Sequence, residues 1–337
     1  MRNPRKTLTI SAGLAALGFV AALLFSGSFR RGQTAHASPA PELLSALPAG
    51  APTLAYFDLA AMRASSFYQH RPDKGPLAVP NQEYADFVRS TGFDFEKDLD
   101  RVVVGSWSAP SAKEHVKNVV IAEGRFDRAK IRDYATRKGK LDHQQGHEVY
   151  LFPTGDRMGS NSVTFLDDHR IAIVTGSSIA PLFAASGNDA AADPARERAA
   201  RLDGAAMFMI SHVPPVPDNS GAGGAAPAAQ FLSLARSVQW VTVAARPEGD
   251  NLRISLEGEC DNATDAMQIK AALEILRMFG RAGLESPKST TTMSPAALAM
   301  LQNLLTTAEV TQAAERVRIL IELTPDIFKL SDARKPQ

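Results

Sequence analysis

Residues 119–129 read Val-Val-Ile-Ala-Glu-Gly-Arg-Phe-Asp-Arg-Ala, and residues 253–263 read Arg-Ile-Ser-Leu-Glu-Gly-Glu-Cys-Asp-Asn-Ala. In both stretches an apolar run leads into Glu-Gly, and an Asp three residues after the Gly precedes a helical pattern. Gly favours turns, and Asp is a preferred residue at the start of a helix. The two stretches therefore predict a strand–turn–helix unit that occurs twice.

Six residues of these stretches are interpreted as structural. Each Glu-Gly pair is expected to form the turn, its carboxylate favoured beside the positive end of the following helix, and each Asp is expected to be the N-cap. The residues are Glu123, Gly124 and Asp127 in the first stretch and Glu257, Gly258 and Asp261 in the second.

Further blocks correspond in the same order along the chain. Val163-Thr164 matches Val310-Thr311, and Arg170-Ile171 matches Arg318-Ile319. The shared order predicts an α+β fold of duplicated strand–helix–hairpin–helix–hairpin units with antiparallel or mixed sheets. Whether the two halves share one sheet or form two lobes stays open at this point.

The chain divides by composition into six segments. They are a signal anchor at 1–32, a Pro/Ala-rich linker at 33–52, a first α+β half at 53–186, a connection at 187–203, a second half at 204–331 and a polar tail at 332–337.

The amino-terminal segment predicts one transmembrane helix. Residues 8–25 carry no charge and would span roughly 27 Å as a helix, enough for a bilayer core. More basic residues precede this stretch than follow it, which favours an inner-membrane protein with its amino terminus in the cytoplasm and its body in the periplasm or outside the cell. The alternative is a secreted protein, cleaved near Ala37 at an Ala-x-Ala site.

Composition excludes several classes of protein. With 37 basic and 36 acidic residues the net charge is +1, which gives no field for gathering nucleic acid. The one cysteine, Cys260, rules out an intramolecular disulfide and a cysteine-based zinc site. We interpret it as a small buried hydrophobe.

No catalytic or cofactor motif is present. The sequence has no Gly-x-Ser-x-Gly elbow, P-loop or dinucleotide fingerprint, so no cofactor is expected. His143 and His147 have the spacing of a metal pair on a helix, but their setting predicts loop and strand, so no metal is expected either.

Three residues remain as candidate ligand contacts. His212 ends an apolar strand beside a Pro- and Gly-rich loop. It would line a cleft there, although a histidine in such a place more often caps a core strand. Trp107 and Trp240 lie on comparable hairpins of the two halves. Packing in the core is the default interpretation for both, and a paired aromatic binding face is the alternative.

One stretch resembles a known group of proteins. Residues 44–56 read Leu-Ser-Ala-Leu-Pro-Ala-Gly-Ala-Pro-Thr-Leu-Ala-Tyr, after the predicted anchor. This resembles the start of uncharacterised bacterial membrane-anchored envelope proteins, in which a Leu-Pro-Ala phrase precedes the first strand of a duplicated α+β domain. The resemblance implies an envelope location and no activity.

Three hypotheses about function follow. The first is a non-catalytic, membrane-anchored protein that binds another protein or an envelope component. The second is a carrier of lipid or another apolar small ligand, with a mobile loop at 213–226 serving the binding site. The third is a hydrolase with an unrecognised site around His212 or the His143 and His147 pair.

Overall fold

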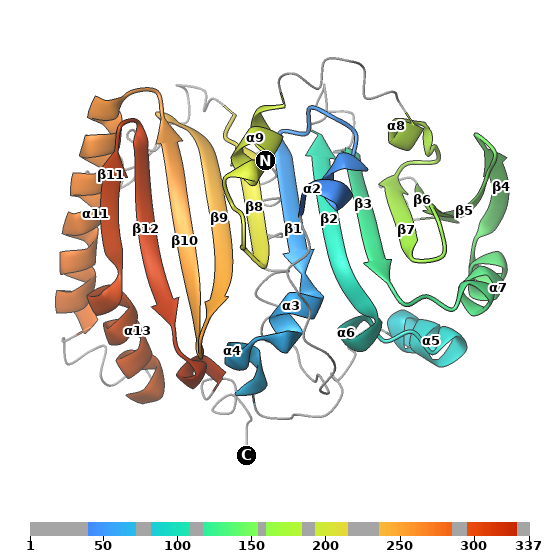
Figure 1. The fold of residues 1–337 in the computed structure, drawn as a ribbon, viewed down its shortest axis with the longest axis horizontal. Helices are drawn as coiled ribbons and strands as arrows, with labels where there is room; N and C mark the ends of the chain where they lie inside the picture. The colour runs from blue at the N-terminus through green and yellow to red at the C-terminus, as the bar shows by residue number, and fades with distance from the viewer. Residues whose placement is uncertain are drawn as a thin grey trace, which may run out of the picture.

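A computed structural model describes residues 40–71, 82–107, 117–153, 160–183, 193–214, 236–284 and 295–328. These residues form one antiparallel sheet of twelve strands, seen nearly face-on in Figure 1, in the order β11-β12-β10-β9-β8-β1-β2-β3-β7-β6-β5-β4. The strands are β1 Thr53–Asp58, β2 Leu99–Trp107, β3 Lys117–Gly124, β4 Lys140–Gln144, β5 His147–Pro153, β6 Ser160–Phe165, β7 Arg170–Thr175, β8 Met207–His212, β9 Val238–Glu248, β10 Asn251–Cys260, β11 Glu309–Ala313 and β12 Arg316–Leu323.

Helices lie on both faces of this sheet. They are α2 Ala40–Ser45, α3 Leu59–Ala64, α4 Ser66–Gln69, α5 Gln82–Thr91, α6 Phe95–Asp98, α7 Arg128–Lys138, α8 Ala180–Phe183, α9 Pro194–Ala200, α11 Ala263–Leu284, α13 Pro295–Thr307 and the 3-10 turn η2 Pro325–Phe328. The α+β prediction is confirmed, with an antiparallel sheet.

The alternation of side chains along the strands separates two cores. On one face, which we call the α2 face, Leu54, Val103 and Ile121 of the central strands pack against α2 and α9. On the opposite face, the α3 face, Phe57 and Val102 pack against α3 and α4. Helices α5, α7, α11 and α13 also cover the α3 face, so most helical mass lies on that side.

The two ends of the sheet differ on the α2 face. Beyond β8 helix α9 reaches this face at Trp240 of β9 and Glu259 of β10. Elsewhere the face carries ion pairs between strands, such as Arg318 with Glu257 at 2.5 Å and Arg253 with Glu248 at 3.0 Å. A sheet with one apolar face and one solvated face is common among antiparallel folds. Most of the helical cover of these strands therefore lies on the α3 face.

The structure corrects the prediction that Glu-Gly forms a turn. Gly124 is the last residue of β3, and Gly258 lies inside β10, paired with both β9 and β12. Each Glu instead forms a cross-strand ion pair, Glu123 with Arg101 and Glu257 with Arg318. Each carboxylate is thus stabilised by an arginine on the neighbouring strand, and not by the dipole of the following helix as predicted.

The structure confirms one predicted helix start and corrects the other in its details. The side chain of Asp127 accepts a hydrogen bond from the backbone N of Lys130 at 3.1 Å and caps α7. At α11 the corresponding bond runs from the N of Asp265 to Asn262 at 3.0 Å, so Asn262 is the cap in place of Asp261. Asp261 accepts instead from the side chain of Gln239 at 2.5 Å.

A further strand was absent from the predictions. Residues 140–144 form β4, which pairs with β5 through a tight turn in which Gln145 and Gly146 both have positive φ. The sequence Lys-Leu-Asp-His-Gln has little apolar character because this edge strand is largely exposed.

Several predictions concern residues outside the described ranges. These are the span at 8–25, the cleavage site near Ala37, the loop at 215–226 and the tail at 332–337. None of the helices in the described ranges combines the length and the hydropathy that a bilayer span requires.

The two glycines of the repeated phrase have different surroundings, which gives a matched test. A Cβ on Gly124 would overlap the backbone carbonyl oxygen of Asp98, whereas a Cβ on Gly258 would meet only Val238 and Val317 side-chain carbons at 3.5 Å. We expect Gly124→Ala to lower the free energy of unfolding by about 2 to 3 kcal/mol, as overpacking does, and Gly258→Ala to change it by less than about 1 kcal/mol. Urea denaturation measures both; equal effects would contradict this explanation.

Candidate functional site

A cavity lies on the α3 face, between the sheet and helices α5 and α7. Its volume is about 660 Å³, within the range of small-molecule binding sites. It is lined by Phe57, Leu59, Phe87, Phe93, Phe95, Leu99, Val102, Val104, Val120, Ala122, Phe126, Ile131, Tyr134, Ala135, Tyr150, Phe152, Val163, Phe165, Ile171 and Ile173.

The lining is almost entirely apolar. Only Tyr134 and Tyr150 have a side-chain polar atom, and seven of the 16 phenylalanines of the chain line this one space. The space is partly open to the surface, where Ile173 is 36% exposed. Its apolar lining is suited to an apolar guest.

The floor of the cavity follows from the register of the sheet. Val102, Ala122 and Ile171 are paired neighbours on β2, β3 and β7, so their side chains face the same side. Helix α7 covers part of this floor, where Ile131 packs against Phe165 and Ile171. The rest of the floor stays open to the cavity.

Aromatic contacts build the wall opposite the floor. The ring of Phe87 on α5 contacts Phe93 at 5.9 Å and Tyr134 of α7 at 5.2 Å, measured between ring centroids, and Phe93 stacks on Phe126 at 5.2 Å. Gly92, with a φ of 72°, ends α5 and turns the chain so that Phe93 reaches this cluster. Rings that pack against each other brace the wall without filling the space behind it.

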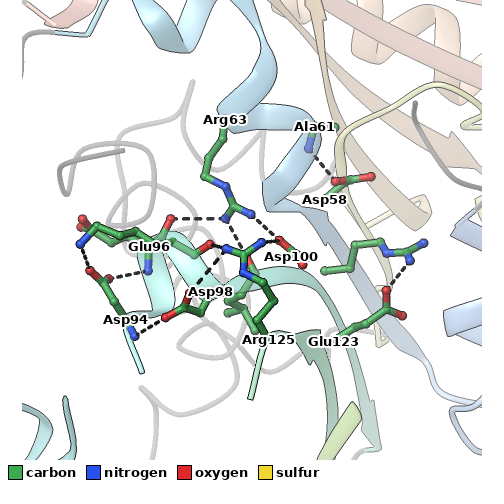
Figure 2. A network of polar contacts seen from close by, with 12 residues as sticks. Asp58, Ala61, Arg63, Asp94, Glu96, Asp98, Asp100, Glu123 and Arg125 are labelled. Carbon is green, nitrogen blue, oxygen red and sulfur yellow. Dashed lines mark hydrogen bonds and ion pairs between the residues drawn. The ribbon is translucent and has the colours of Figure 1, made fainter. Parts of the chain in front are cut away.

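The segment that carries Phe93 of this wall also belongs to a network of charged side chains (Figure 2). Between residues 93 and 100 the apolar residues line the cavity, and the acidic residues Asp94, Glu96, Asp98 and Asp100 alternate with them. Arg63 of α3 contacts Asp100 at 2.6 Å and donates to the backbone O of Leu99 at 2.6 Å.

A second arginine joins the same network. Arg125 lies 3.5 Å from Asp98 and 3.5 Å from Asp100, and it immediately precedes Phe126 of the cavity wall. The two arginines thus fix residues 93–100 to α3 and to the end of β3 (Figure 2). The network positions the cavity wall, and among the described residues no cluster of His, Cys, Asp or Glu is arranged to hold a metal ion.

One carboxylate of the network has a strongly shifted pKa. The pKa of Glu96, which is 4% exposed, is raised to about 7, mainly by burial and also by the neighbouring Asp94, while Arg71 and Lys97 act in the opposite direction. Glu96 therefore changes its charge near neutral pH.

Of the two copies of the repeated Glu-Gly phrase, only the first lies beside the cavity. Glu123, Gly124 and Asp127 flank Arg125 and Phe126, so this phrase contributes one wall residue and one residue of the network. The second phrase lies on β10 and lines no part of the cavity.

The candidate ligand contacts are placed on the α2 face and line no part of the cavity. His212 packs edge-on against Trp240 at 5.0 Å, and the guanidinium of Arg198 lies 4.2 Å from the centre of the Trp240 ring. Trp107 is on β2, with β1 and β8 between it and Trp240. The two tryptophans therefore form no paired aromatic face; both pack separately against the α2-face core, as the default interpretation predicts.

The remaining groups near Trp240 form an ion cluster. Glu259 contacts Arg198 and lies 3.0 Å from Arg201. Burial raises the pKa of this carboxylate, but the hydrogen bonds from the two arginines outweigh burial and lower it overall. This cluster joins α9 to β10, and this structural role explains why these charged residues lie together.

The two histidines considered for metal lie on the β4–β5 hairpin. His143 pairs with Glu148 in the ladder, and His147 pairs with Gln144 and stacks on Phe183 at 4.8 Å. The ring contact of His147 accounts for its position.

The cavity was missed by sequence reasoning, although one signal of it exists. Residues 93–100 read Phe-Asp-Phe-Glu-Lys-Asp-Leu-Asp, an alternation of apolar and acidic residues at a helix end. It marks a segment with one apolar and one charged side. It does not reveal that the apolar side faces a void.

Comparisons with known proteins add little. No family model and no curated protein matches the sequence. Among solved structures, crystal form III of TP0453 aligns with a TM-score of 0.45 and 10% identity over 89% of this chain and 100% of that chain. Crystal form IV of the same protein gives a TM-score of 0.42 at 10% identity, over 86% of this chain and 95% of that chain. Similarity of this size defines neither a family nor a function.

The shifted pKa of Glu96 makes stability depend on pH. The folded protein keeps this proton up to about pH 7, whereas the unfolded chain releases it near the ordinary value of 4.5, so raising the pH through this window favours unfolding. Between pH 5 and 8 we expect the stability of the wild type to fall relative to Glu96→Gln by on the order of 2 kcal/mol, since one pKa unit is about 1.4 kcal/mol.

Urea denaturation at a series of pH values measures this difference. Asp133→Asn, at a carboxylate that is 77% exposed, is the control and should shift the wild-type curve by a constant amount. Parallel pH profiles for the wild type and Glu96→Gln would show that Glu96 titrates normally.

Proposed function

We propose that this protein binds an apolar small molecule, of the class of a lipid acyl chain, in the cavity beneath α5 and α7. The observation that carries the proposal is a space of about 660 Å³ whose lining has two polar side-chain groups among twenty residues. This is the second of the three hypotheses drawn from the sequence. It is compatible with the first, because a lipid is itself an envelope component.

The energetics of the cavity support this class of ligand. Each methylene group that leaves water contributes about 0.8 kcal/mol, so ten of them supply roughly 8 kcal/mol before the entropic costs of binding. Micromolar binding corresponds to a net free energy of about 8 kcal/mol, so once those costs are subtracted a chain of ten methylene groups binds more weakly than this and a longer acyl chain binds more tightly. A polar or charged ligand would lose its hydration here and gain few hydrogen bonds in return.

We propose a binding role without catalysis. The hydroxyl of Tyr150 donates to Glu148 at 3.2 Å, and Glu148 is paired with Arg132 at 2.8 Å. Burial, together with the charge of Glu148, raises the pKa of Tyr150, so its hydroxyl stays protonated at neutral pH and is a poor acid. The groups at this end of the cavity support positioning of a ligand better than a chemical step.

We further propose that the protein is anchored by residues 8–25, with its amino terminus in the cytoplasm and its body outside. The uncharged stretch and the excess of basic residues before it support this topology. A lipid-binding body tethered beside a bilayer would have its ligand at high local concentration.

The duplication also remains a proposal. Outward from the central β1–β8 pair, the sheet reads β1-β2-β3-β7-β6 on one side and β8-β9-β10-β12-β11 on the other. Matching orders of this kind support two related units. In the second unit α11 and α13 take the places of α7 and the β4–β5 hairpin, which restricts the cavity to the first.

Photoaffinity labelling tests ligand binding in the full chain. We expect diazirine-bearing stearic acid, added to membranes that contain the protein, to label peptides covering residues 93–102 and 120–135. Ala122→Phe places a ring in the cavity and should reduce this labelling at least fivefold. Ala313→Phe makes the same change on exposed β11 and should leave labelling unaltered.

Thermal denaturation of both variants shows whether the fold is intact, and Val120→Met is a milder cavity-filling alternative. Labelling of the cavity peptides that persists unchanged in folded Ala122→Phe and Val120→Met would overturn the proposal.

A reporter fusion tests the anchor. Alkaline phosphatase at the carboxyl terminus should be active and should stay with the membrane after an alkaline wash, because the span is retained. Mass spectrometry should find the amino-terminal segment intact. A soluble product that begins after Ala37 would instead establish the cleaved form.

A further inference from the structure

The outer side of α11 is the most exposed apolar surface in the described part of the chain. Met267, Ile275, Leu276, Met278 and Phe279 are 52% to 65% exposed. Elsewhere in the described residues no large apolar side chain is more than 39% exposed. Apolar side chains gathered in this way usually mark a contact surface.

The packing of α11 explains why this side is free of the sheet. Ala266, Ile269 and Leu273 pack against the ends of β10 and β12. Further along the helix a Cβ on Gly280 would lie 3.1 Å from Leu305 of α13, so the two helices are in close contact there. At about 100° per residue, Ile275, Met278 and Phe279 then lie on the side opposite Ala266, Ile269 and Leu273. Leu276 lies at the border of this side, four residues before Gly280, and is 57% exposed. Helix α11 runs along the outer edge of the sheet (Figure 1).

Basic side chains border this apolar side. Lys270, Arg277 and Arg281 are spaced by seven and four residues and form one stripe along α11. Arg277 contacts Glu274 at 2.8 Å and donates to the backbone O of Ala308, so a contact with lipid headgroups would rest on Lys270 and Arg281. Helix α13 has no charged residue and adds Leu301, which is 37% exposed. A helix with an apolar side and a basic border suits a bilayer surface, where the basic side chains reach anionic headgroups.

We propose that α11, with α13 beside it, docks in the surface of an anionic lipid bilayer, with Ile275, Leu276, Met278 and Phe279 at the level of the acyl chains. The length of the preceding chain permits this. The predicted span ends at Phe25 and α2 begins at Ala40, so residues 26–39 extend at most about 50 Å. The proposal rests on the proposed anchor and is independent of the cavity.

Fluorescence quenching by lipids tests the docking. The full chain is reconstituted into phosphatidylglycerol and phosphatidylcholine vesicles whose acyl chains carry bromine, which quenches tryptophan by contact. Phe279→Trp and Leu276→Trp are compared with the wild type, which supplies the signal of Trp107 and Trp240. Leu141→Trp is the control, at a residue that is 38% exposed on β4 at the opposite edge of the sheet.

We expect the added fluorescence at positions 279 and 276 to be quenched at least twofold, and that at position 141 to be unaffected. No quenching at 279 and 276 in vesicle-bound protein would overturn the docking and leave the anchor intact; cross-linked dimers through these positions would then identify a second copy as the partner. Protein that fails to float with the vesicles would overturn both.

Discussion

The pairing of β1 with β8 is the contact on which the rest of the molecule depends. It joins residues that are far apart in the sequence, from Thr53 with Ser211 to Phe57 with Met207, and five of the six β1 residues are buried. Backbone bonds extend the pair at both ends, from Asp58 N to Ala206 O at 2.7 Å and from His212 N to Pro52 O at 2.8 Å. Because every other strand is added outward from this pair, the sheet is continuous and both of its cores meet here.

The two ends of this continuous sheet are covered by different helices, and the cavity results from that difference. Beyond β8 the α3 face is covered by α11 and α13, and the α2 face is stabilised by cross-strand ion pairs. Beyond β1 the shorter α7 cannot cover the floor that β2, β3 and β7 provide. The aromatic wall, braced by Arg63 and Arg125 from outside, borders the space without filling it. The cavity thus results from the shorter helix, from the braced wall and from strand β5, whose Tyr150 and Phe152 add to its lining.

Local patterns in the sequence were informative where local forces decide the structure. The hairpins, the α+β class and the cap at Asp127 follow from alternation and capping preferences. The Glu-Gly turns were wrong because the arginine partners of Glu123 and Glu257 lie on other strands, and no local pattern reveals them. Asp261 and Asn262 are adjacent residues with similar capping preference, so the sequence could not choose between them. The cavity is a space between segments that are up to 116 residues apart, from Phe57 to Ile173, and no single segment encodes it.

Cys260 has a consequence for the redox chemistry of the chain. The thiol is 5% exposed in the small core between α11 and the sheet, and burial, with the nearby Asp265 and Asp261, raises its pKa to about 11. At neutral pH roughly one molecule in ten thousand then carries the thiolate that attacks a disulfide. In an oxidising compartment this thiol would therefore react only slowly with disulfides. The packing that holds α11 on the sheet also lowers the reactivity of the only cysteine.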